Sequence, residues 1–327
     1  RVAGGMKGSV TGRRANAVIV RDDRGNAVDT EKVAAAIKAN PEDKGCAFVH
    51  AETSTGVQSD AAALCKLASD NNMLSIVDTV TGLAGIEVAV DAWGADAVYS
   101  GTQKCLSCVP GLSPVTFSER AIDVVKNRKT AVQSWFLDLN LVMAYWGGGA
   151  KRAYHHTAPV NSLYALHESL CIVKEEGLQA SWTRHQRNHL ALRAGLETMG
   201  LSLVVNEADR LPQLNLVSIP QGIDEAAVRG QLLNEFDLEI GAGLGELAGK
   251  VWRIGLMGYG SNPSNVRLCL SALENALINQ GWVIALLKFL QYSGKLKRMR
   301  RDNSIIMIRR SDHCRRIFNA GFHVVHR

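Results

Sequence analysis

Two short apolar runs, residues 74–77 and 95–99, place the strongest constraint on how this chain folds, because each is followed by a polar loop. Their length and β-branched content are typical of buried strands. Asp78 opens the first loop, and Lys104 lies in the second. In an open α/β sheet, ligands bind in the crevice outside the carboxyl ends of parallel strands. We therefore expect a carboxylate and an amine to face one crevice.

Upstream of these runs the sequence alternates between strand and helix patterns. Residues 17–20 and 46–49 are strand-like, and each precedes a helical pattern. Asp29 or Thr30 is expected to cap the first helix, and the second is expected over residues 59–71. Repeated units of this kind favour a parallel sheet with helices on its faces and right-handed crossovers. The predicted fold class is therefore α/β.

Downstream, the pattern changes from strand–helix repeats to long helices and then to short strands. Residues 114–117 predict a strand, Ser118 is expected to cap the next helix, and residues 136–146 predict another. Residues 161–199 are helical in pattern with a break near Gly177, and we expect this long segment to link two domains.

The last part of the predicted fold is a compact α+β domain. Strands are expected over four segments and helices over two, and the chain alternates between them. The strands are residues 201–205, 214–220, 238–240 and 251–256, and the helices are residues 224–236 and 263–279. The glycine-rich segment 241–245 lacks a following helix, so it does not fit a dinucleotide-binding fingerprint.

The residue types around Asp78 and Lys104 indicate a particular chemistry. A lysine held in a pocket can lose its proton and act as a nucleophilic amine, and a fixed aspartate can hold a protonated ring nitrogen. Together these are the needs of an enzyme that uses pyridoxal phosphate (PLP). Taken singly, each residue also fits an ordinary role, because an aspartate after a strand often caps a helix and a loop lysine often faces water.

The order of motifs in residues 74–111 resembles that of one known family. The sequence VDTVTGLAG is followed by a Trp-Gly-x-Asp turn, by YSGTQK and by a Pro-Gly step. This arrangement resembles the class V, fold-type I aminotransferases, most closely the alanine– or serine–glyoxylate aminotransferases. The resemblance implies that PLP is the cofactor, that Lys104 is the Schiff-base lysine and that Asp78 is the partner of the pyridinium nitrogen.

The same resemblance assigns further residues to the cofactor. Thr53, in the segment HAETSTG, and Gln103, directly before the lysine, match positions that contact it. Thr157, in the segment YHHT, matches a residue that holds the cofactor phosphate of the neighbouring subunit, and Tyr154 lies beside it. The resemblance therefore implies a homodimer. Without it, the YHHT segment fits a plain solvated turn equally well, and His50 is a lesser candidate.

Arg253 is a charged residue among apolar strand neighbours, so it needs an anionic partner. That partner is either a structural ion pair or a ligand. The resemblance favours the α-carboxylate of the substrate, which the planar guanidinium binds in a bidentate manner.

Charge and cysteine content exclude several other classes. The formal net charge is +6, but the excess of basic residues lies in residues 283–327. The rest of the chain is therefore mildly acidic. We therefore expect no nucleic-acid or membrane partner.

The seven cysteines are scattered along the chain, which fits free thiols in a reducing compartment, and we expect a cytoplasmic protein. Cys105 and Cys108 have no second ligand pair, so no metal site is expected.

The resemblance covers residues 17–282 and implies a domain organisation. We expect an incomplete PLP-binding large domain with a mostly parallel sheet over residues 1–175, and a smaller C-terminal α+β domain over residues 176–282. Residues 283–327 are then a basic tail outside the family. The family's glycine-containing phosphate loop and stacking aromatic residue cannot be placed in residues 1–26, so the N-terminal part of the family fold is expected to be missing.

The functional expectation is an aminotransferase that moves an amino group from alanine or serine to glyoxylate or another small keto acid. Its substrates are then small amino acids and keto acids. Two alternatives stay open at this point. One is an inactive, truncated homologue that binds no PLP, and the other is a PLP-independent lyase that uses Lys104 to form an imine.

Overall fold

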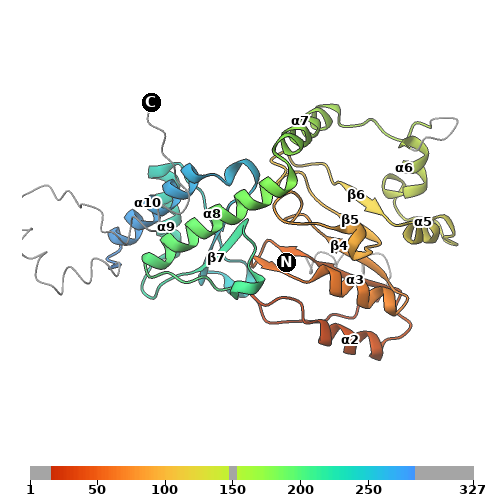
Figure 1. Ribbon diagram of the computed structural model, residues 1–327, viewed down its shortest axis with the longest axis horizontal. Coiled ribbons are helices and arrows are strands. Elements are labelled where there is room, and N and C mark those ends of the chain that lie inside the picture. Colours follow the sequence, from red (N-terminus) through yellow and green to blue (C-terminus); the bar gives the residue numbers. More distant parts are fainter. Residues whose placement is uncertain (1–15, 147–152, 284–327) are drawn as a thin grey trace, which may run out of the picture.

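The computed structural model describes residues 16–146 and 153–283, which form two regions with separate sheets and cores (Figure 1). One region contains helices α2 to α6 and the larger sheet. The other contains α9, α10 and a smaller sheet. Helix α8 lies along the second region, and α7 continues from it over the first.

The larger sheet has four strands in the order β1-β4-β5-β6. The strands are β1 (Gly45–Val49), β4 (Leu74–Asp78), β5 (Ala97–Tyr99) and β6 (Val115–Phe117). The first three run parallel, and β6 is antiparallel to β5. The helices of this region are α2 (Thr30–Ala39), α3 (Ala61–Asp70), α4 (Val90–Trp93) and α5 (Glu119–Lys126). The mostly parallel sheet predicted from the sequence is therefore confirmed.

Short polar side chains set where these helices begin. Asp29 caps α2, Asp60 caps α3 and Ser118 caps α5, each by accepting hydrogen bonds from backbone N–H groups of the first turn. The apolar residues of α2 and α3 then face the sheet. Leu64 and Ala68 of α3 are completely buried and pack with Val77 of β4 in one core cluster.

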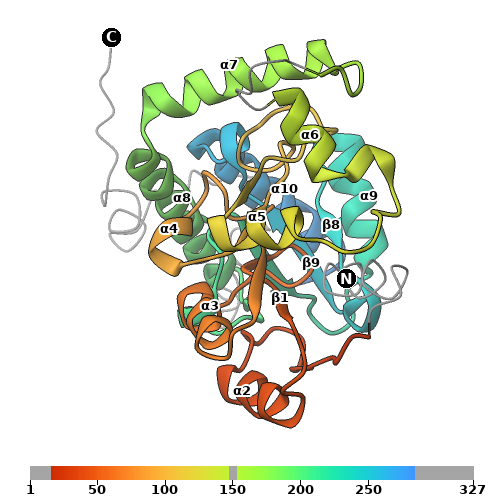
Figure 2. The ribbon, with the colours of Figure 1, turned by 90° about the vertical axis from the view of Figure 1, so that its right-hand side faces the viewer.

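The first region also contains a hairpin, the short turn η1 and α6, and two long helices link it to the second region. The hairpin consists of β2 (Ala51–Glu52) and β3 (Val57–Gln58), and the helices are η1 (Trp135–Leu137), α6 (Leu139–Trp146), α7 (Val160–Glu176) and α8 (Leu178–Thr198). Gly177, with φ of +83°, separates α7 from α8, as the sequence break predicts. In Figure 2, α7 lies at the end of the molecule opposite α2.

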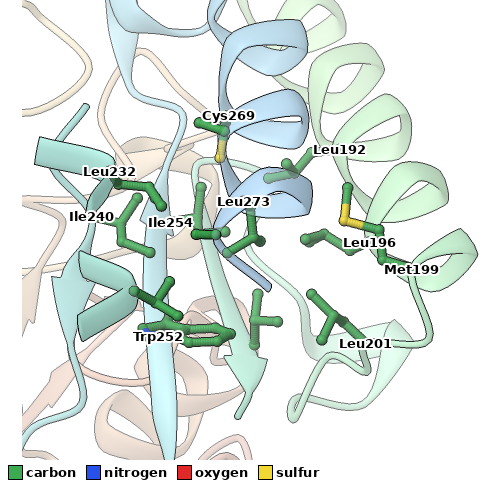
Figure 3. Close-up of a cluster of buried hydrophobic side chains, with 14 of the residues drawn as sticks. Leu192, Leu196, Met199, Leu201, Leu232, Ile240, Trp252, Ile254, Cys269 and Leu273 are labelled. Carbon is green, nitrogen blue, oxygen red and sulfur yellow. The ribbon is translucent and has the colours of Figure 1, made fainter. Parts of the chain in front are cut away.

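The smaller sheet is antiparallel, in the order β7-β9-β8. Its elements are β7 (Leu214–Ser218), α9 (Glu225–Phe236), β8 (Gly241–Ala242), β9 (Val251–Gly255) and α10 (Pro263–Asn279), with short 3-10 turns η2 (Glu207–Asp209), η3 (Gly245–Leu247) and η4 (Gly258–Gly260). Figure 3 shows Leu192 and Leu196 of α8, Leu273 of α10 and Trp252 of β9 meeting in the core. This region matches the smaller α+β unit predicted from the sequence.

Three predicted strands are wrong. Residues 17–20 are not a strand, and Val18 and Ile19 are exposed. Residues 201–205 form only an isolated bridge between Leu203 and Val217. Residues 238–240 are irregular, and the strand begins at Gly241 instead. Residues 17–20 pair with no strand of the described residues. Residues 201–205 lie beside β7, but only the Val204 N–H, which donates to the Leu216 carbonyl, and the Ser202 carbonyl, which accepts from the Ser218 N–H, pair with it. Composition alone does not reveal how far such pairing extends.

The predicted domain boundaries at residues 175/176 and 282/283 stay predictions. The first lies at the end of α7, and nearly all of the predicted tail, residues 284–327, lies outside the described residues. Among the helices that the structure describes, none is long and apolar enough to cross a bilayer.

Candidate functional site

The three parallel strands of the larger sheet end level with one another. Val49, the last residue of β1, pairs with Asp78, the last residue of β4, and Asp78 pairs with Tyr99, the last residue of β5. Because the strands are parallel, the loops that follow them leave from the same edge of the sheet. This edge is where the sequence predicts the ligand crevice.

Asp78 is buried at this edge, with 2% of its surface exposed. Its Oδ1 atom accepts a hydrogen bond of 2.9 Å from the backbone N–H of Val80, and its carboxylate accepts another from the Tyr99 hydroxyl. The neighbouring β5 therefore supplies a polar partner for the carboxylate. This role of Tyr99 leaves no signal in the sequence, because only the strand register places its side chain beside Asp78.

Opposing effects act on the ionisation of Asp78, and together they raise the pKa of its carboxyl group. Burial raises the pKa of its carboxyl group, and the nearby Glu52 carboxylate adds to the increase. The hydrogen bonds from Tyr99 and from the Val80 N–H lower the pKa by favouring the charged form. Burial and the contact with Asp78 also raise the pKa of Tyr99, so its hydroxyl keeps its proton and acts as the donor.

Lys104 lies five positions after the end of β5, in an irregular loop, and its side chain is half-buried. The loop folds back on itself: Thr102 Oγ1 donates to the carbonyl of Val109 at 2.6 Å, and the N–H of Ser107 donates to the carbonyl of Lys104 at 2.9 Å. Gln103 is exposed, and its side chain lies over Gly101, where an added Cβ would come within 2.7 Å of Oε1.

Thr53 and Arg253, predicted from separate parts of the sequence, are brought together. Thr53 lies in the turn between β2 and β3, and Arg253 is the central residue of β9. Nη1 of Arg253 donates to the Thr53 carbonyl at 3.2 Å, and Nε donates to the Ala242 carbonyl at 2.7 Å. The guanidinium of the smaller region therefore reaches the loop that follows β1.

Close backbone contact holds this loop against the smaller sheet. Gly56 has φ of +74°, and a Cβ atom there would lie 2.5 Å from the carbonyl oxygen of Leu214. Its own carbonyl accepts a hydrogen bond of 2.9 Å from the Leu211 N–H. Only glycine permits both the backbone angle and this approach. The β2–β3 hairpin is thus fixed beside Arg253.

His50, the lesser candidate, has a packing environment. It is 2% exposed, its Nδ1 atom hydrogen-bonds with the Ser59 carbonyl at 3.1 Å, and its ring lies 4.8 Å from that of Trp93. Burial lowers the pKa of the imidazole. Its backbone N–H donates to the Asp78 carbonyl at 2.9 Å, so His50 ties the two strand ends together.

Tyr154 and Thr157 form a separate pair. The Tyr154 hydroxyl and Thr157 Oγ1 are 2.7 Å apart, and both residues are exposed, Tyr154 by 73%. The ring of Tyr145 lies edge-on to that of Tyr154. The pair sits in the connection between α6 and α7 rather than at the strand ends, so the prediction that Thr157 serves a neighbouring subunit stays a prediction.

Comparison with known proteins bears on this arrangement of strand ends, lysine loop and arginine strand. The model of one family, described as aminotransferase class-V, matches residues 11–257. This chain belongs to that family. The match spans Asp78, Lys104 and Arg253, and members of the family depend on PLP.

Individual relatives agree with the family match. The (S)-ureidoglycine–glyoxylate transaminase of Bacillus subtilis is 38% identical over 295 residues, covering 85% of this chain and 70% of the relative. The alanine–glyoxylate aminotransferase of Felis catus is 40% identical over 228 residues, covering 69% of this chain. The chain spans 55% of the length of that feline relative.

Solved structures share the fold. The crystal structure of alanine–glyoxylate aminotransferase from Nostoc sp. superposes with a TM-score of 0.81 at 44% identity, covering 84% of this chain and 72% of the other. That of ureidoglycine–glyoxylate aminotransferase from Bacillus subtilis gives 0.84 at 38% identity, covering 89% and 74%. The predicted family and fold-type I architecture are therefore confirmed.

The residues of the site fit the cofactor of this family. Asp78 supplies a buried carboxylate whose pKa burial raises, and the hydrogen bonds from the Val80 N–H and the Tyr99 hydroxyl offset part of that rise. A protonated ring nitrogen beside it would favour its charged form. Lys104 supplies the half-buried amine in the adjoining loop. The donor set therefore suits a pyridine ring held between an anion and an amine.

Proposed function

We propose that this chain is a PLP-dependent aminotransferase that transfers an amino group from alanine or serine to glyoxylate or another small keto acid. The observation that carries the proposal is the level ending of β4 and β5, which sets the buried Asp78 carboxylate at the edge from which the Lys104 loop leaves. Membership of the class-V family supplies the reaction type.

Each residue has a distinct task in the proposed reaction. PLP, when bound, supplies an electron sink for the carbanion at the substrate Cα. Asp78 would accept a hydrogen bond from the ring nitrogen and keep it protonated, and Lys104 would hold the cofactor through its amine and move a proton at the substrate Cα. Tyr99 helps to keep Asp78 charged.

Arg253 is proposed to bind the α-carboxylate of the substrate. Its guanidinium already donates to two backbone carbonyls, those of Ala242 and Thr53, which fix its plane. A planar guanidinium with fixed orientation favours bidentate binding of a carboxylate. The Thr53 carbonyl is in contact with it, so the proposed cofactor residue and the proposed substrate residue are neighbours although they come from different regions.

A homodimer is part of the proposal. The segment from η1 to α7 carries many large apolar side chains on its surface, more than scattered exposure on a monomer requires. They are Trp135, Phe136, Leu137, Trp146, Tyr154, Val160, Leu163, Tyr164, Leu170 and Ile172. A second copy covering this surface would bring Tyr154 and Thr157 to the site of its partner. Sedimentation of the chain across a range of concentrations tests the point, and a strictly monomeric chain would contradict it.

The decisive experiment is incubation with PLP, reduction with borohydride and peptide mapping. A pyridoxyl label on Lys104, absent from the Lys104→Ala protein but unaffected by Lys66→Ala at an exposed helix position, supports the proposal. A label on another lysine would overturn the assignment. No PLP uptake would favour the inactive homologue, and trapping of a keto substrate on Lys104 without PLP would favour the lyase.

The donor is tested with glyoxylate as acceptor and alanine, serine or ureidoglycine as donor, with glycine formation as the measurement. Ureidoglycine enters the panel because the Bacillus subtilis relative is named for it. A preference for ureidoglycine over both amino acids would replace the proposed donor while leaving the transaminase reaction in place.

A further inference from the structure

The loop that carries Lys104 is connected to the smaller region through Ser107. The Ser107 N–H donates to the Lys104 carbonyl at 2.9 Å, and Ser107 Oγ accepts a hydrogen bond of 2.8 Å from the Tyr259 N–H. Ser107 has φ of +55°, in the left-handed region that serine rarely adopts. The surrounding contacts therefore hold it in a conformation that it would not prefer on its own.

Gly258 permits this contact. It is buried, with φ of +53°, and a Cβ atom at this position would lie 2.0 Å from Ser107 Oγ and 2.6 Å from the Cys105 carbonyl oxygen. The turn η4 therefore packs directly against the backbone of the Lys104 loop. No other residue type at position 258 allows the two segments to approach so closely.

Helix α8 fixes the turn from the other side. His185 is completely buried, and its Nε2 atom accepts a hydrogen bond of 2.9 Å from the Gly258 N–H. Its Nδ1 atom lies 2.7 Å from the Ser181 carbonyl, so Nδ1 carries the proton and the ring is neutral. Nη1 of Arg184 donates to the Gly258 carbonyl at 2.7 Å.

Arg184 is itself held in place. Its Nε atom is 2.5 Å from Oε1 of Glu176 at the end of α7, and Nη1 also donates to the Ser261 carbonyl at 2.9 Å. The peptide groups on both sides of Gly258 are therefore bound to α8. A chain of direct contacts runs from α8 through η4 and Ser107 to the backbone of Lys104.

We propose that Ser107 is a positioning residue for Lys104, and that the turn Gly258–Tyr259, seated on His185 and Arg184, is its anchor in the smaller region. The inference rests on the proposed role of Lys104 and adds to it. The smaller region then contributes more than the carboxylate-binding arginine, because it also sets where the reactive amine stands.

A positioning role for Ser107 can be told from a merely structural one, because it predicts a local change at the Lys104 loop without a loss of overall stability. Ser107 and Tyr259 are exposed, so water replaces the hydrogen bond when the hydroxyl is removed, and overall stability changes little. The peptide beside Lys104 nevertheless loses its link to the rigid turn. Local opening at the loop should therefore increase without a comparable fall in the melting temperature.

The experiment compares Ser107→Ala with two other variants. Ser264→Ala removes an exposed serine hydroxyl in α10 of the smaller region, away from the Lys104 loop, and is the matched control. Ser107→Asn keeps an acceptor and suits the left-handed backbone, so it serves as the rescue. The measurements are hydrogen exchange of the peptide spanning residues 102–109, acetylation of Lys104 relative to the exposed Lys66, and the pH titration of the visible band with PLP bound.

We expect Ser107→Ala to raise exchange and Lys104 acetylation roughly fivefold, the equivalent of one hydrogen bond of about 1 kcal/mol, and to shift the titration of the visible band. Ser264→Ala should leave all three unchanged, and Ser107→Asn should restore the wild-type values. Equal exchange and acetylation in wild type and Ser107→Ala would overturn the inference. If PLP fails to label Lys104 in the wild type, the proposed function fails, whereas exchange and acetylation still decide the role of Ser107.

Discussion

Two groups of predicted site residues differ in how completely this one chain surrounds them. Asp78 is buried, and its carboxylate has partners from its own loop and from β5. Tyr154 and Thr157 are exposed and hydrogen-bond to each other. The difference shows that the strand ends form a finished polar environment within one chain, while the exposed pair has surface left for a second molecule. Each prediction below tests one side of this contrast.

The largest effect is expected for Asp78→Asn. The substitution keeps the shape of the side chain but removes the negative charge that holds a protonated ring nitrogen, so kcat should fall by about a hundredfold to a thousandfold. Steady-state kinetics with alanine and glyoxylate measure it, and thermal unfolding should show a native-like transition. A fall of less than threefold would mean that the buried carboxylate has no part in the reaction.

Tyr99→Phe should have a smaller effect in the same direction. Loss of the hydroxyl removes a hydrogen bond that lowers the Asp78 pKa, while burial and Glu52 continue to raise it. The acid limb of the kcat profile should therefore move to higher pH, and kcat at neutral pH should fall about tenfold. Tyr259→Phe is the control, because the Tyr259 side chain is 87% exposed and its contact with Ser107 is made by the backbone N–H. An unshifted acid limb would show that Tyr99 does not act through Asp78.

Acid should lower the stability of the folded chain through two buried histidines of α8. Burial lowers the pKa of His185 and of His189, so in acid the unfolded chain binds protons that the folded chain does not. The free energy of unfolding should be at its full value above the unfolded histidine pKa of about 6.5 and fall as the pH drops below it. Urea unfolding at pH 5 and pH 7.5 measures this.

His185→Gln sharpens the same measurement. Glutamine can still accept a hydrogen bond from the Gly258 N–H but does not titrate. We expect the loss of stability between the two pH values to be smaller in this variant than in wild type. An identical loss in both proteins would assign the acid sensitivity to groups other than His185.

The smallest effect on stability is expected at the exposed pair. Thr157→Val removes the hydroxyl that contacts Tyr154, and a surface change of this kind should shift the free energy of unfolding by less than about 0.5 kcal/mol. If a neighbouring subunit uses Thr157, PLP affinity should nevertheless fall, and only at protein concentrations where the dimer forms. An affinity loss of the same size in the monomer would place Thr157 in the site of its own chain.

The sequence predicts most of the helices because their signals are local. Asp29 and Ser118 each cap the helix that the sequence predicts them to cap. The helix Pro263–Asn279 has the predicted bounds, since Pro at its start and a periodic apolar face mark it. Residues 17–20 were wrongly predicted as a strand because a strand needs a partner that composition alone does not reveal. Residues 201–205 do lie beside β7, but they pair with it through a single bridge rather than a regular ladder.

In the candidate site, too, local sequence patterns predict some residues, whereas contacts between distant residues could not be predicted. Asp78 and Lys104 follow from strand–loop order, and the family resemblance supplies Thr53 and Arg253. The contact of Arg253 with the Thr53 carbonyl joins residues 200 positions apart, and that of Tyr259 with Ser107 joins residues 152 positions apart. Neither pairing leaves a local pattern. The contact of Tyr99 with Asp78 is equally hidden in the sequence, because it depends on the register between β4 and β5.

The link between Tyr259 and Ser107 also has a consequence for the order of events during synthesis. The Lys104 loop leaves the ribosome 152 residues before its anchor does. At ordinary elongation rates that interval is about 8 to 30 s. During this interval the Lys104 loop lacks its contact with Tyr259, so PLP that bound early would meet an incompletely folded site. Stable binding of PLP is then a late step, which follows the synthesis of the turn η4.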